Sequence, residues 1–273
     1  MFEKIHQKYL KLKKGLSYLS QLPTVMSGLN KRLDDISGLN KRLDDIFYNM
    51  QVLSMLQNFH APVFPQFKGV HEGERIVIVA SGPSARRYKR MPNALHLAIN
   101  FSFYRSDIEF DYMFVNDCSI EDKQNNRYFD KRIENTKKFF GMIPKKRLSQ
   151  LSRLQNMQPR LLNMPNTYAY LLEDVLCNKF ATHLECEPFG DFCGTVFSAL
   201  QFVLYTKPAQ IYLVGCDCTH SSHFYDSSYT NDYSPMYNSF IKFSDFAKAT
   251  YPDIQIYSIN PVRLKGLFND VYM

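Results

Sequence analysis

The sequence lacks a long hydrophobic run, and no apolar stretch approaches the roughly 18 residues that a membrane-spanning helix needs. No hydrophobic segment typical of a signal peptide follows Met1, so we expect a cytoplasmic protein, with peripheral contact to the inner face of the cytoplasmic membrane left open. Tryptophan is absent, which excludes nothing by itself. None of the six cysteines forms a Cys-x-x-Cys pair, which favours free thiols in a reducing compartment.

The composition is that of a folded protein with a basic surface. Of the 273 residues, 45% are hydrophobic, which is enough for one core domain and an appendage. The net charge of +7 favours an anionic partner: a nucleotide, an acidic glycan, a membrane surface or a nucleic acid. We expect no nucleic acid, because no basic stripe with interleaved aromatic residues occurs in the part of the chain that predicts strands.

A perfect duplication marks the N-terminal region, where residues 27–36 (SGLNKRLDDI) recur as residues 37–46. Apolar residues three and four positions apart, with charges between them, predict an amphipathic helix. The repeat is shorter than three full turns of an α-helix, so any supercoil should be left-handed. We expect residues 1–56 to form a helical, coiled-coil extension that drives homo-oligomerisation. The alternatives are a helix folded back on its own domain and a duplication without consequence.

Residues 1–20 carry a second pattern, in which lysines stand among aromatic and aliphatic residues. Such a basic helix can lie on an anionic bilayer. A solvated, frayed helix is the alternative.

The rest of the chain predicts an α/β domain. Residues 57–72, with Pro62 and Pro65, indicate a linker, and short apolar runs alternate with helical patterns over residues 73–273. This order predicts a Rossmann-like, largely parallel sheet. Strands are expected at 75–80, 94–100, 112–116, 137–140, 210–214 and 255–258, and helices near 168–177, at 195–205 and at 239–250.

Small polar residues follow three of these strands. The first strand ends in a tight turn whose backbone N–H groups should face outward, and the next two end in asparagine. Because the carboxyl ends of parallel strands share one edge of a sheet, these residues should converge on a ligand. The candidates are Ser81, Gly82, Pro83, Ser84, Asn100, Asn116 and Asp117.

Two further segments belong to this predicted edge. Cys193, Gly194 and Thr195 open an apolar helix, whose first N–H groups suit an anion, although Thr195 or Asp191 can equally be a simple N-cap. Asn260 precedes Pro261 after the last strand, and a residue before proline is held extended.

The loop after residue 214 is the most polar and reactive segment. It holds Asp217, His220, His223 and Tyr225. Histidine titrates near neutral pH, so either His220 or His223 is a candidate general base. The spacing of Cys216, Cys218 and the two histidines is not typical of structural zinc sites, so we expect no metal.

These motifs resemble the bacterial sialyltransferases of glycosyltransferase family 42 and the related Maf-like nonulosonate transferases. The resemblance covers about residues 74–270: the strand with Gly82-Pro83-Ser84, two strands ending in asparagine, a Gly-Thr turn before an apolar helix, the Gly215-Cys216-Asp217 strand end, and a final Pro turn. It implies a single-domain, sialyltransferase-like (GT-A-variant) fold. It also implies a site without metal or cofactor, in which the turn and the asparagines hold a CMP-sugar, Cys193-Gly194-Thr195 contacts the ribose or donor sugar, and Tyr225, or Tyr229, stabilises the departing phosphate.

The implied activity is inverting transfer of sialic acid, Kdo or another nonulosonic acid to a glycan or glycolipid acceptor at the cell surface. The family base lies just before the last helix, where this chain has Pro235 and no histidine. Either His220 or His223 takes that role, or Asp217, Asp226 or Asp232 does, or the chemistry differs. The alternative functions are a Maf-like pterin pyrophosphokinase and a non-catalytic coiled-coil assembly protein with a degenerate nucleotide fold.

Overall fold

A computed structural model describes residues 2–116, 127–142, 161, 163–172, 179–192 and 194–273. The chain divides into two units, Met1–Asn49 and Met50–Met273. The division falls close to the boundary that the sequence places after residue 56.

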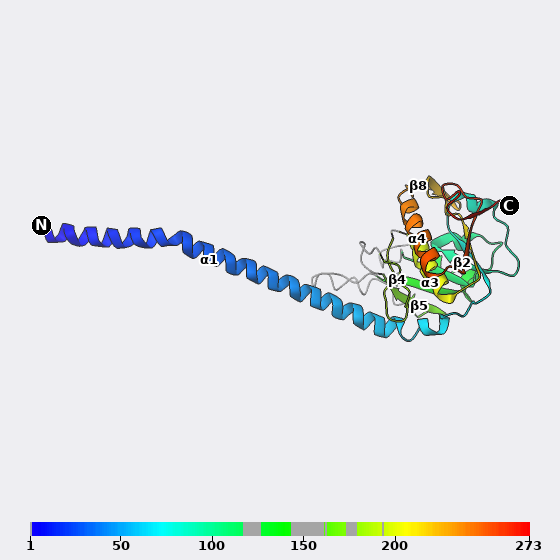
Figure 1. Cartoon of the computed structure of the whole chain (residues 1–273), viewed down its shortest axis with the longest axis horizontal. Helices are drawn as coiled ribbons and strands as arrows, with labels where there is room; N and C mark the ends of the chain where they lie inside the picture. Colours follow the sequence, from blue (N-terminus) through cyan, green and yellow to red (C-terminus); the bar gives the residue numbers. More distant parts are fainter. Residues whose placement is uncertain (1, 117–126, 143–160, 162, 173–178, 193) are drawn as a thin grey trace. The chain divides into compact units, whose positions relative to one another are not determined.

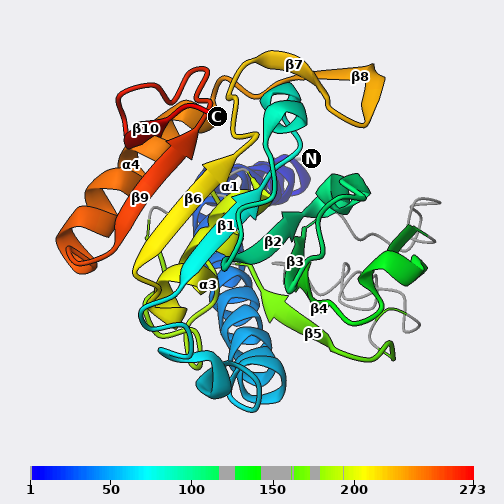
Figure 2. The same cartoon turned by 90° about the vertical axis from the view of Figure 1, so that its right-hand side faces the viewer.

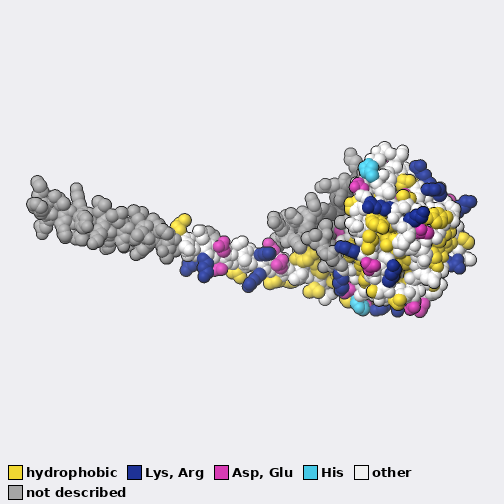
Figure 3. Space-filling view, turned by 45° about the horizontal axis from the view of Figure 1, so that its top comes forward, with side chains coloured by type: hydrophobic (Ala, Val, Ile, Leu, Met, Phe, Trp, Pro, Cys, Tyr) yellow, Lys and Arg dark blue, Asp and Glu magenta, His cyan; other side chains and the backbone are white. Residues whose placement is uncertain are grey.

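The first unit is helical, as the sequence predicts. Helix α1 runs without interruption from Phe2 to Met55 (Figure 1). Its described apolar side chains from Met26 to Leu53 are largely exposed, and they lie among charged side chains (Figure 3). Among the described residues, no helix combines the length and the apolar character that crossing a bilayer requires.

The second unit is built on an eight-stranded sheet with the order β10-β9-β6-β1-β2-β3-β4-β5 (Figure 2). Every neighbouring pair in it is parallel, which confirms the predicted Rossmann-like α/β class. Its strands are β1 (Arg75–Val79), β2 (Leu95–Ile99), β3 (Tyr112–Val115), β4 (Lys137–Met142), β5 (Thr167–Leu171), β6 (Gln210–Val214), β9 (Gln255–Ile259) and β10 (Asn269–Val271).

Both faces of the sheet are covered, which is why its strands are continuous apolar runs. Ile76 and Ile78 of β1 face one core with helices α3 (Thr195–Thr206) and α4 (Met236–Thr250). Val77 and Val79 face the other core, which includes the end of α1 and the short helices η3 (Pro83–Arg87) and η4 (Asn100–Tyr104). All residues of α3 are buried, and among them are the polar side chains of Thr195, Ser198 and Gln201.

The predicted linker, residues 57–72, is part of the folded core. It contains the short helices η1 (Leu56–His60) and η2 (Phe64–Phe67). Phe64 is fully buried and packs against Phe139 and Phe202, with ring centroids 6.0 and 6.5 Å away. The ring of His60 accepts from the N–H of Leu171 and donates to the carbonyl of Leu184, and burial lowers its pKa to about 4. The prolines suggested a linker, but the neighbouring Phe64 and Phe67 are buried in the core.

Three further elements differ from the sequence-based expectations. The segment near 168–177 was expected to be helical, but Thr167–Leu171 is strand β5, and residues 173–178 lie outside the described residues. Short apolar runs do not distinguish a strand from a buried helix by periodicity. The loop after residue 214 contains a hairpin, β7 (His220–His223) and β8 (Asp226–Asp232), which no pattern in the sequence predicted. Helix α4 begins at Met236 rather than Ser239.

Replacing Phe64 with alanine tests whether the segment 57–72 belongs to the core. Phe64→Ala should lower the free energy of unfolding by about 3–5 kcal/mol, because it removes a buried ring and leaves a cavity. Val70→Ala is the matched control in the same segment, where a side chain that is 51% exposed should cost less than about 0.5 kcal/mol. Urea unfolding measures both, and equal small effects would mean that the segment is a linker after all.

Candidate functional site

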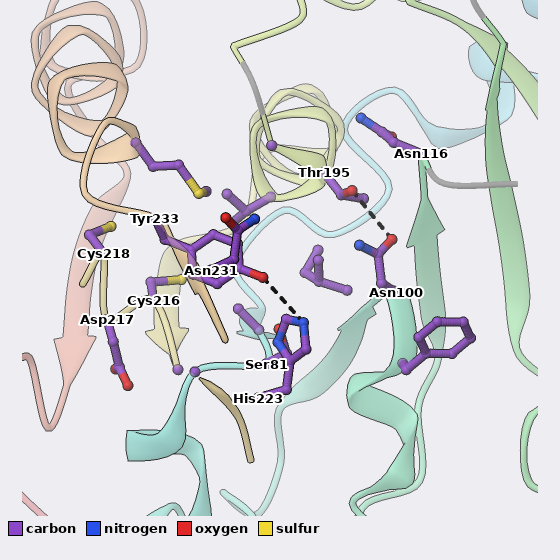
Figure 4. Close-up of a pocket in the computed structure, with 18 of the residues that line it drawn as sticks. Ser81, Asn100, Asn116, Thr195, Cys216, Asp217, Cys218, His223, Asn231 and Tyr233 are labelled. Atoms are coloured by element: carbon purple, nitrogen blue, oxygen red, sulfur yellow. Dashed lines mark hydrogen bonds between the residues drawn. The ribbon is translucent and has the colours of Figure 1, made fainter. Parts of the chain in front are cut away.

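A cavity of about 710 Å³ lies at the carboxyl ends of β1, β2, β3 and β6. The chain proceeds from β1 to β5 on one side of β1 and returns with β6 on the other side, and ligands of open α/β sheets bind at such a switch point. Figure 4 shows seven of its lining residues with labels: Ser81, Asn100, Asn116, Thr195, His223, Asn231 and Tyr233. The lining also includes Gly82, Phe101, Arg127, Gly194, Asp217 and Tyr225.

The turn after β1 is locked to the end of β6. The N–H of Gly82 donates to the carbonyl of Gly215 at 2.9 Å. The N–H of Ser84 donates to the carboxylate of Asp217 at 2.9 Å, and the Ser84 hydroxyl donates to its other oxygen. We expected the backbone N–H groups of this turn to face a ligand. For Gly82 and Ser84 this is wrong, because both N–H groups donate to acceptors of the protein itself. Ser81 and Gly82 line the cavity, whereas Pro83 and Ser84 do not.

Asp217 thus has a different role from the one expected. It lines the cavity, but both of its carboxylate oxygens accept hydrogen bonds from Ser84. A buried carboxylate satisfied in this way fixes the turn. We therefore treat Asp217 as a positioning residue and not as the catalytic base.

The two turns approach so closely that only glycine fits at their contact. A Cβ atom on Gly82 would lie 2.4 Å from the carbonyl oxygen of Gly215 and 2.8 Å from the Asp217 carboxylate. Gly215 has φ +69°, and a Cβ there would lie 2.6 Å from the carbonyl oxygen of Ala80. Gly82 and Gly215 thus allow the chain segments that follow β1 and β6 to touch, and both glycines line the cavity.

Two asparagines form one wall of the cavity, as the sequence predicts. Asn100 has φ +50°, and its Oδ1 accepts from the hydroxyl of Thr195 at 3.3 Å. The Oδ1 of Asn116 accepts from the hydroxyl of Tyr170. In the described part of the chain no hydrogen bond engages the amide nitrogen of either side chain, so both can donate to a ligand.

The start of α3 completes this wall. Gly194, Thr195 and Val196 line the cavity, so the positive end of the helix dipole faces it. Gln201 holds the preceding loop, because its side-chain oxygen accepts from the N–H of Ala181 and of Gly190 at 2.8 and 2.9 Å. Asp117 and Cys193, two predicted binding residues, lie outside the described residues.

The β7–β8 hairpin supplies the opposite wall. His223 Nε2 lies 3.2 Å from the hydroxyl of Tyr233 (Figure 4). The His223 ring also stacks on Tyr225, with centroids 5.0 Å apart and planes 14° apart. Burial lowers the pKa of His223, and the charge of Asp226 opposes this to a smaller extent. The lowered pKa keeps the imidazole neutral at neutral pH, the form that can accept a proton.

His220, the other predicted base, lies away from the cavity. Side chains alternate along a strand, so Ser221 and His223 line the cavity while His220 is exposed. Asp232 is exposed, and its carboxylate accepts from the N–H of Ser234. The side chain of Tyr229 lies outside the described residues.

Asn260 also differs from its prediction. Its Oδ1 accepts from the N–H of Met273 at 3.0 Å, and the residue does not line the cavity. The strand after it explains this, because β10 pairs with β9 and carries the C-terminal residues back to Asn260. Asn260 therefore joins the end of the sheet to the C-terminus.

The two cysteines near the cavity, Cys216 and Cys218, were weighed as metal ligands in the sequence. Among the residues that the structure describes, no three His, Cys, Asp or Glu side chains are grouped as ligands. Burial raises the pKa of the Cys216 thiol, and it raises that of Cys218 to about 12. Both thiols are therefore protonated at neutral pH.

Sequence reasoning missed several residues that line the cavity. Asn231 lies on β8 and Tyr233 directly follows it, and this segment is rich in Ser, Asn and Asp and so carries no strand signal. Arg127 lies with its guanidinium carbon 5.2 Å from the centroid of the Phe101 ring. Among the described lining residues it is the single Lys or Arg.

No protein-family model matches the chain, and no curated protein matches its sequence. Among solved structures, the chain is similar to the sialyltransferase CstII from Campylobacter jejuni, in a structure with the substrate analogue CMP-3FNeuAc. The similarity covers 72% of this chain and 85% of that chain, with 14% sequence identity and a TM-score of 0.40.

Replacing Gly82 with alanine tests the close contact between the turns. Gly82→Ala should lower the free energy of unfolding by about 1–3 kcal/mol, because the added methyl group meets a backbone carbonyl that cannot move freely. Gly266→Ala is the control: φ is +76°, but nothing lies within 4 Å of the added Cβ. It should cost about 1 kcal/mol for the left-handed backbone alone. A smaller loss for Gly82→Ala, measured by urea unfolding, would contradict the contact.

Proposed function

We propose that this protein is a glycosyltransferase that moves an acidic sugar from a CMP-sugar donor to a hydroxyl group of a glycan or glycolipid. The donor class comes from the resemblance of the strand-end motifs to family 42. The cavity supplies the groups that such a transfer requires. Transfer proceeds with inversion, and none of its steps needs a metal.

One observation carries the proposal: a single cavity at the switch point brings together amide donors and a neutral histidine. Asn100 and Asn116 lie on the side of the strand ends, and His223 lies on the side of the hairpin. Amide side chains suit a base or a ribose, because they donate and accept. A neutral imidazole suits the removal of a proton from an attacking hydroxyl.

The proposed reaction follows from this arrangement. The oxygen of the acceptor hydroxyl attacks the anomeric carbon of the donor sugar. The bond from that carbon to the phosphate oxygen breaks, and CMP leaves with the electron pair. His223 accepts the proton of the hydroxyl, and Tyr233 orients the imidazole through the contact at its Nε2.

Charge develops on the phosphate as CMP departs, and two residues are placed to stabilise it. Burial raises the pKa of Tyr225, so its hydroxyl stays protonated and can donate to a phosphate oxygen. Arg127 brings a permanent positive charge to the cavity. Both residues contact the Phe101 ring, Tyr225 edge to face with centroids 6.2 Å apart.

A nucleotide screen on the full chain tests the donor class. CMP should raise the melting temperature, because a ligand that binds only the folded state stabilises it. Asn100→Ala should weaken CMP binding about tenfold, the effect of about one lost hydrogen bond. Calorimetric titration measures the dissociation constant.

Asn166→Ala is the matched control. Asn166 has φ +56°, close to the +50° of Asn100, but it is exposed and outside the cavity lining. Both variants therefore place alanine at a similar positive φ and should lose a similar amount of stability. Only Asn100→Ala should lose affinity for CMP. A response to ATP with magnesium and not to CMP would favour the pterin pyrophosphokinase, and no response to any nucleotide would favour a non-catalytic protein.

The pH dependence of transfer tests His223 as the base. A base must be neutral to work, and burial lowers the pKa of His223 from its ordinary value of 6.5. Activity should therefore be constant at neutral pH and fall on acidification, with a midpoint below pH 6.5 in kcat/KM. His223→Asn should reduce kcat by about 100-fold or more, the usual contribution of general base catalysis.

His220→Ala serves as the control, because His220 belongs to the same hairpin but is exposed. His220→Ala should keep the wild-type kcat and the wild-type decrease in activity at acidic pH. If His223→Asn retains the wild-type kcat and the wild-type decrease in activity at acidic pH, another group is the base. Binding of CMP by His223→Asn shows that the variant is folded.

A further inference from the structure

The residue between His223 and Tyr225 is held from outside the cavity by an arginine. Arg86 belongs to the short helix η3, 138 residues earlier in the chain, and does not line the cavity. Its Nε and Nη2 both donate to the carbonyl of Phe224, at 3.1 and 2.8 Å. Hydrogen bonds from a charged donor are stronger than neutral ones, and the rigid planar guanidinium also fixes their direction.

The β7–β8 hairpin depends on its neighbours for its position. It forms a two-stranded sheet apart from the eight-stranded one, and its pairing is irregular between Ser222 and His223. A two-stranded hairpin is marginally stable at best by itself. Helix η3 lies beside β7 (Figure 2). Contacts between these two elements therefore decide where the hairpin places its side chains.

Both peptide groups of Phe224 are tied to the segment that follows β1. The N–H of Phe224, in the peptide plane shared with His223, donates to the carbonyl of Ser81 at 2.9 Å. The carbonyl of Phe224, in the plane shared with Tyr225, accepts from Arg86. Because peptide groups are planar, the first bond acts on the position of His223 and the second on that of Tyr225. The Phe224 side chain is 8% exposed and adds an apolar anchor.

Helix η3 is itself held at both ends. Near its start, the N–H and the hydroxyl of Ser84 donate to the carboxylate of Asp217. Near its other end, the guanidinium of Arg105 donates to the carbonyl of Ala85, and its Nη2 donates to the carbonyl of Tyr88 at 2.7 Å. The side chain that reaches the hairpin therefore extends from a backbone with little freedom to follow a moving hairpin.

We propose that Arg86 is a positioning residue, which holds Phe224 so that Tyr225 and His223 face the cavity in the geometry that transfer needs. This role rests on the proposed function, because it concerns the groups that act in that reaction. Without the two bonds from Arg86, the peptide group between Phe224 and Tyr225 can rotate, and the Tyr225 hydroxyl moves away from the phosphate. The stacking of Tyr225 on His223, with centroids 5.0 Å apart, passes the displacement to the base.

The kinetics of Arg86→Ala in the full chain test this role. The variant's kcat should fall about 10–100-fold, because a displacement of about 1 Å in a reacting group can cost 100-fold. The dissociation constant of CMP should stay within about threefold of wild type, a smaller change than the loss of one hydrogen bond to a charged group. Asn100 and Asn116 bind from the other wall and do not depend on the hairpin. An equal loss of kcat and of CMP affinity would contradict a positioning role.

A double-mutant cycle shows whether Arg86 acts through Tyr225. In the background of Tyr225→Phe, the change Arg86→Ala should lower kcat by much less than it does in wild type, because residues that act through one group are not additive. Additive losses would mean that Arg86 acts independently of Tyr225. Arg87→Ala is the matched control, because Arg87 belongs to the same short helix, carries the same charge and is exposed. Arg87→Ala should keep the wild-type kcat.

Hydrogen exchange tests the contact without a donor sugar. Exchange of the backbone amides in residues 220–232 should become faster in Arg86→Ala and stay at the wild-type rate in Arg87→Ala. Unchanged exchange in Arg86→Ala overturns the proposal, and so does faster exchange with the kcat of wild type. A wild type that binds CMP but transfers no sugar overturns the proposed function instead, and the exchange rates then still decide whether Arg86 holds the hairpin.

Discussion

The site depends on the contact between the chain segments that follow β1 and β6. Gly82 and Gly215 bring the two turns within reach of each other, and the carboxylate of Asp217 holds Ser84 by two hydrogen bonds. The strands are neighbours in the sheet, but pairing alone does not fix the loops beyond their ends. The loop after β6 then continues into the β7–β8 hairpin, so this contact also places His223 and Tyr225 over the cavity. The N–H of Phe224 donates to the carbonyl of Ser81 at 2.9 Å and secures the hairpin to the same turn.

The core explains how a site made of loops keeps its geometry. Phe64, Phe67, Phe114, Phe139 and Phe202 pack as one aromatic group between the sheet, η2 and α3. Aromatic rings bury large areas with few rotatable bonds, so they fix the position of α3 against the sheet. Thr195 at the start of α3 consequently meets Asn100 at the end of β2. The high aromatic content of the chain thus supports the position of one wall.

The two units carry different kinds of chemistry. The sheet unit encloses its apolar surface and presents polar groups in one cavity. Helix α1 leaves an apolar stripe exposed and repeats its charges at a fixed interval. Surface that a chain leaves uncovered in this way marks an interaction site.

The sequence by itself determined the class of the sheet, most of its strands, the helix α1 and the wall formed by Asn100, Asn116 and Thr195. Apolar periodicity and the shared edge of parallel strands are local rules, and they hold without knowledge of distant contacts. Only the tertiary structure decided that Asp217 holds a turn, that Asn260 binds the C-terminus, and that His223 rather than His220 faces the cavity. It also placed residues 57–72 in the core and made the 220–232 segment a hairpin. These outcomes depend on contacts between residues far apart in the chain, which compete with and override the local signals.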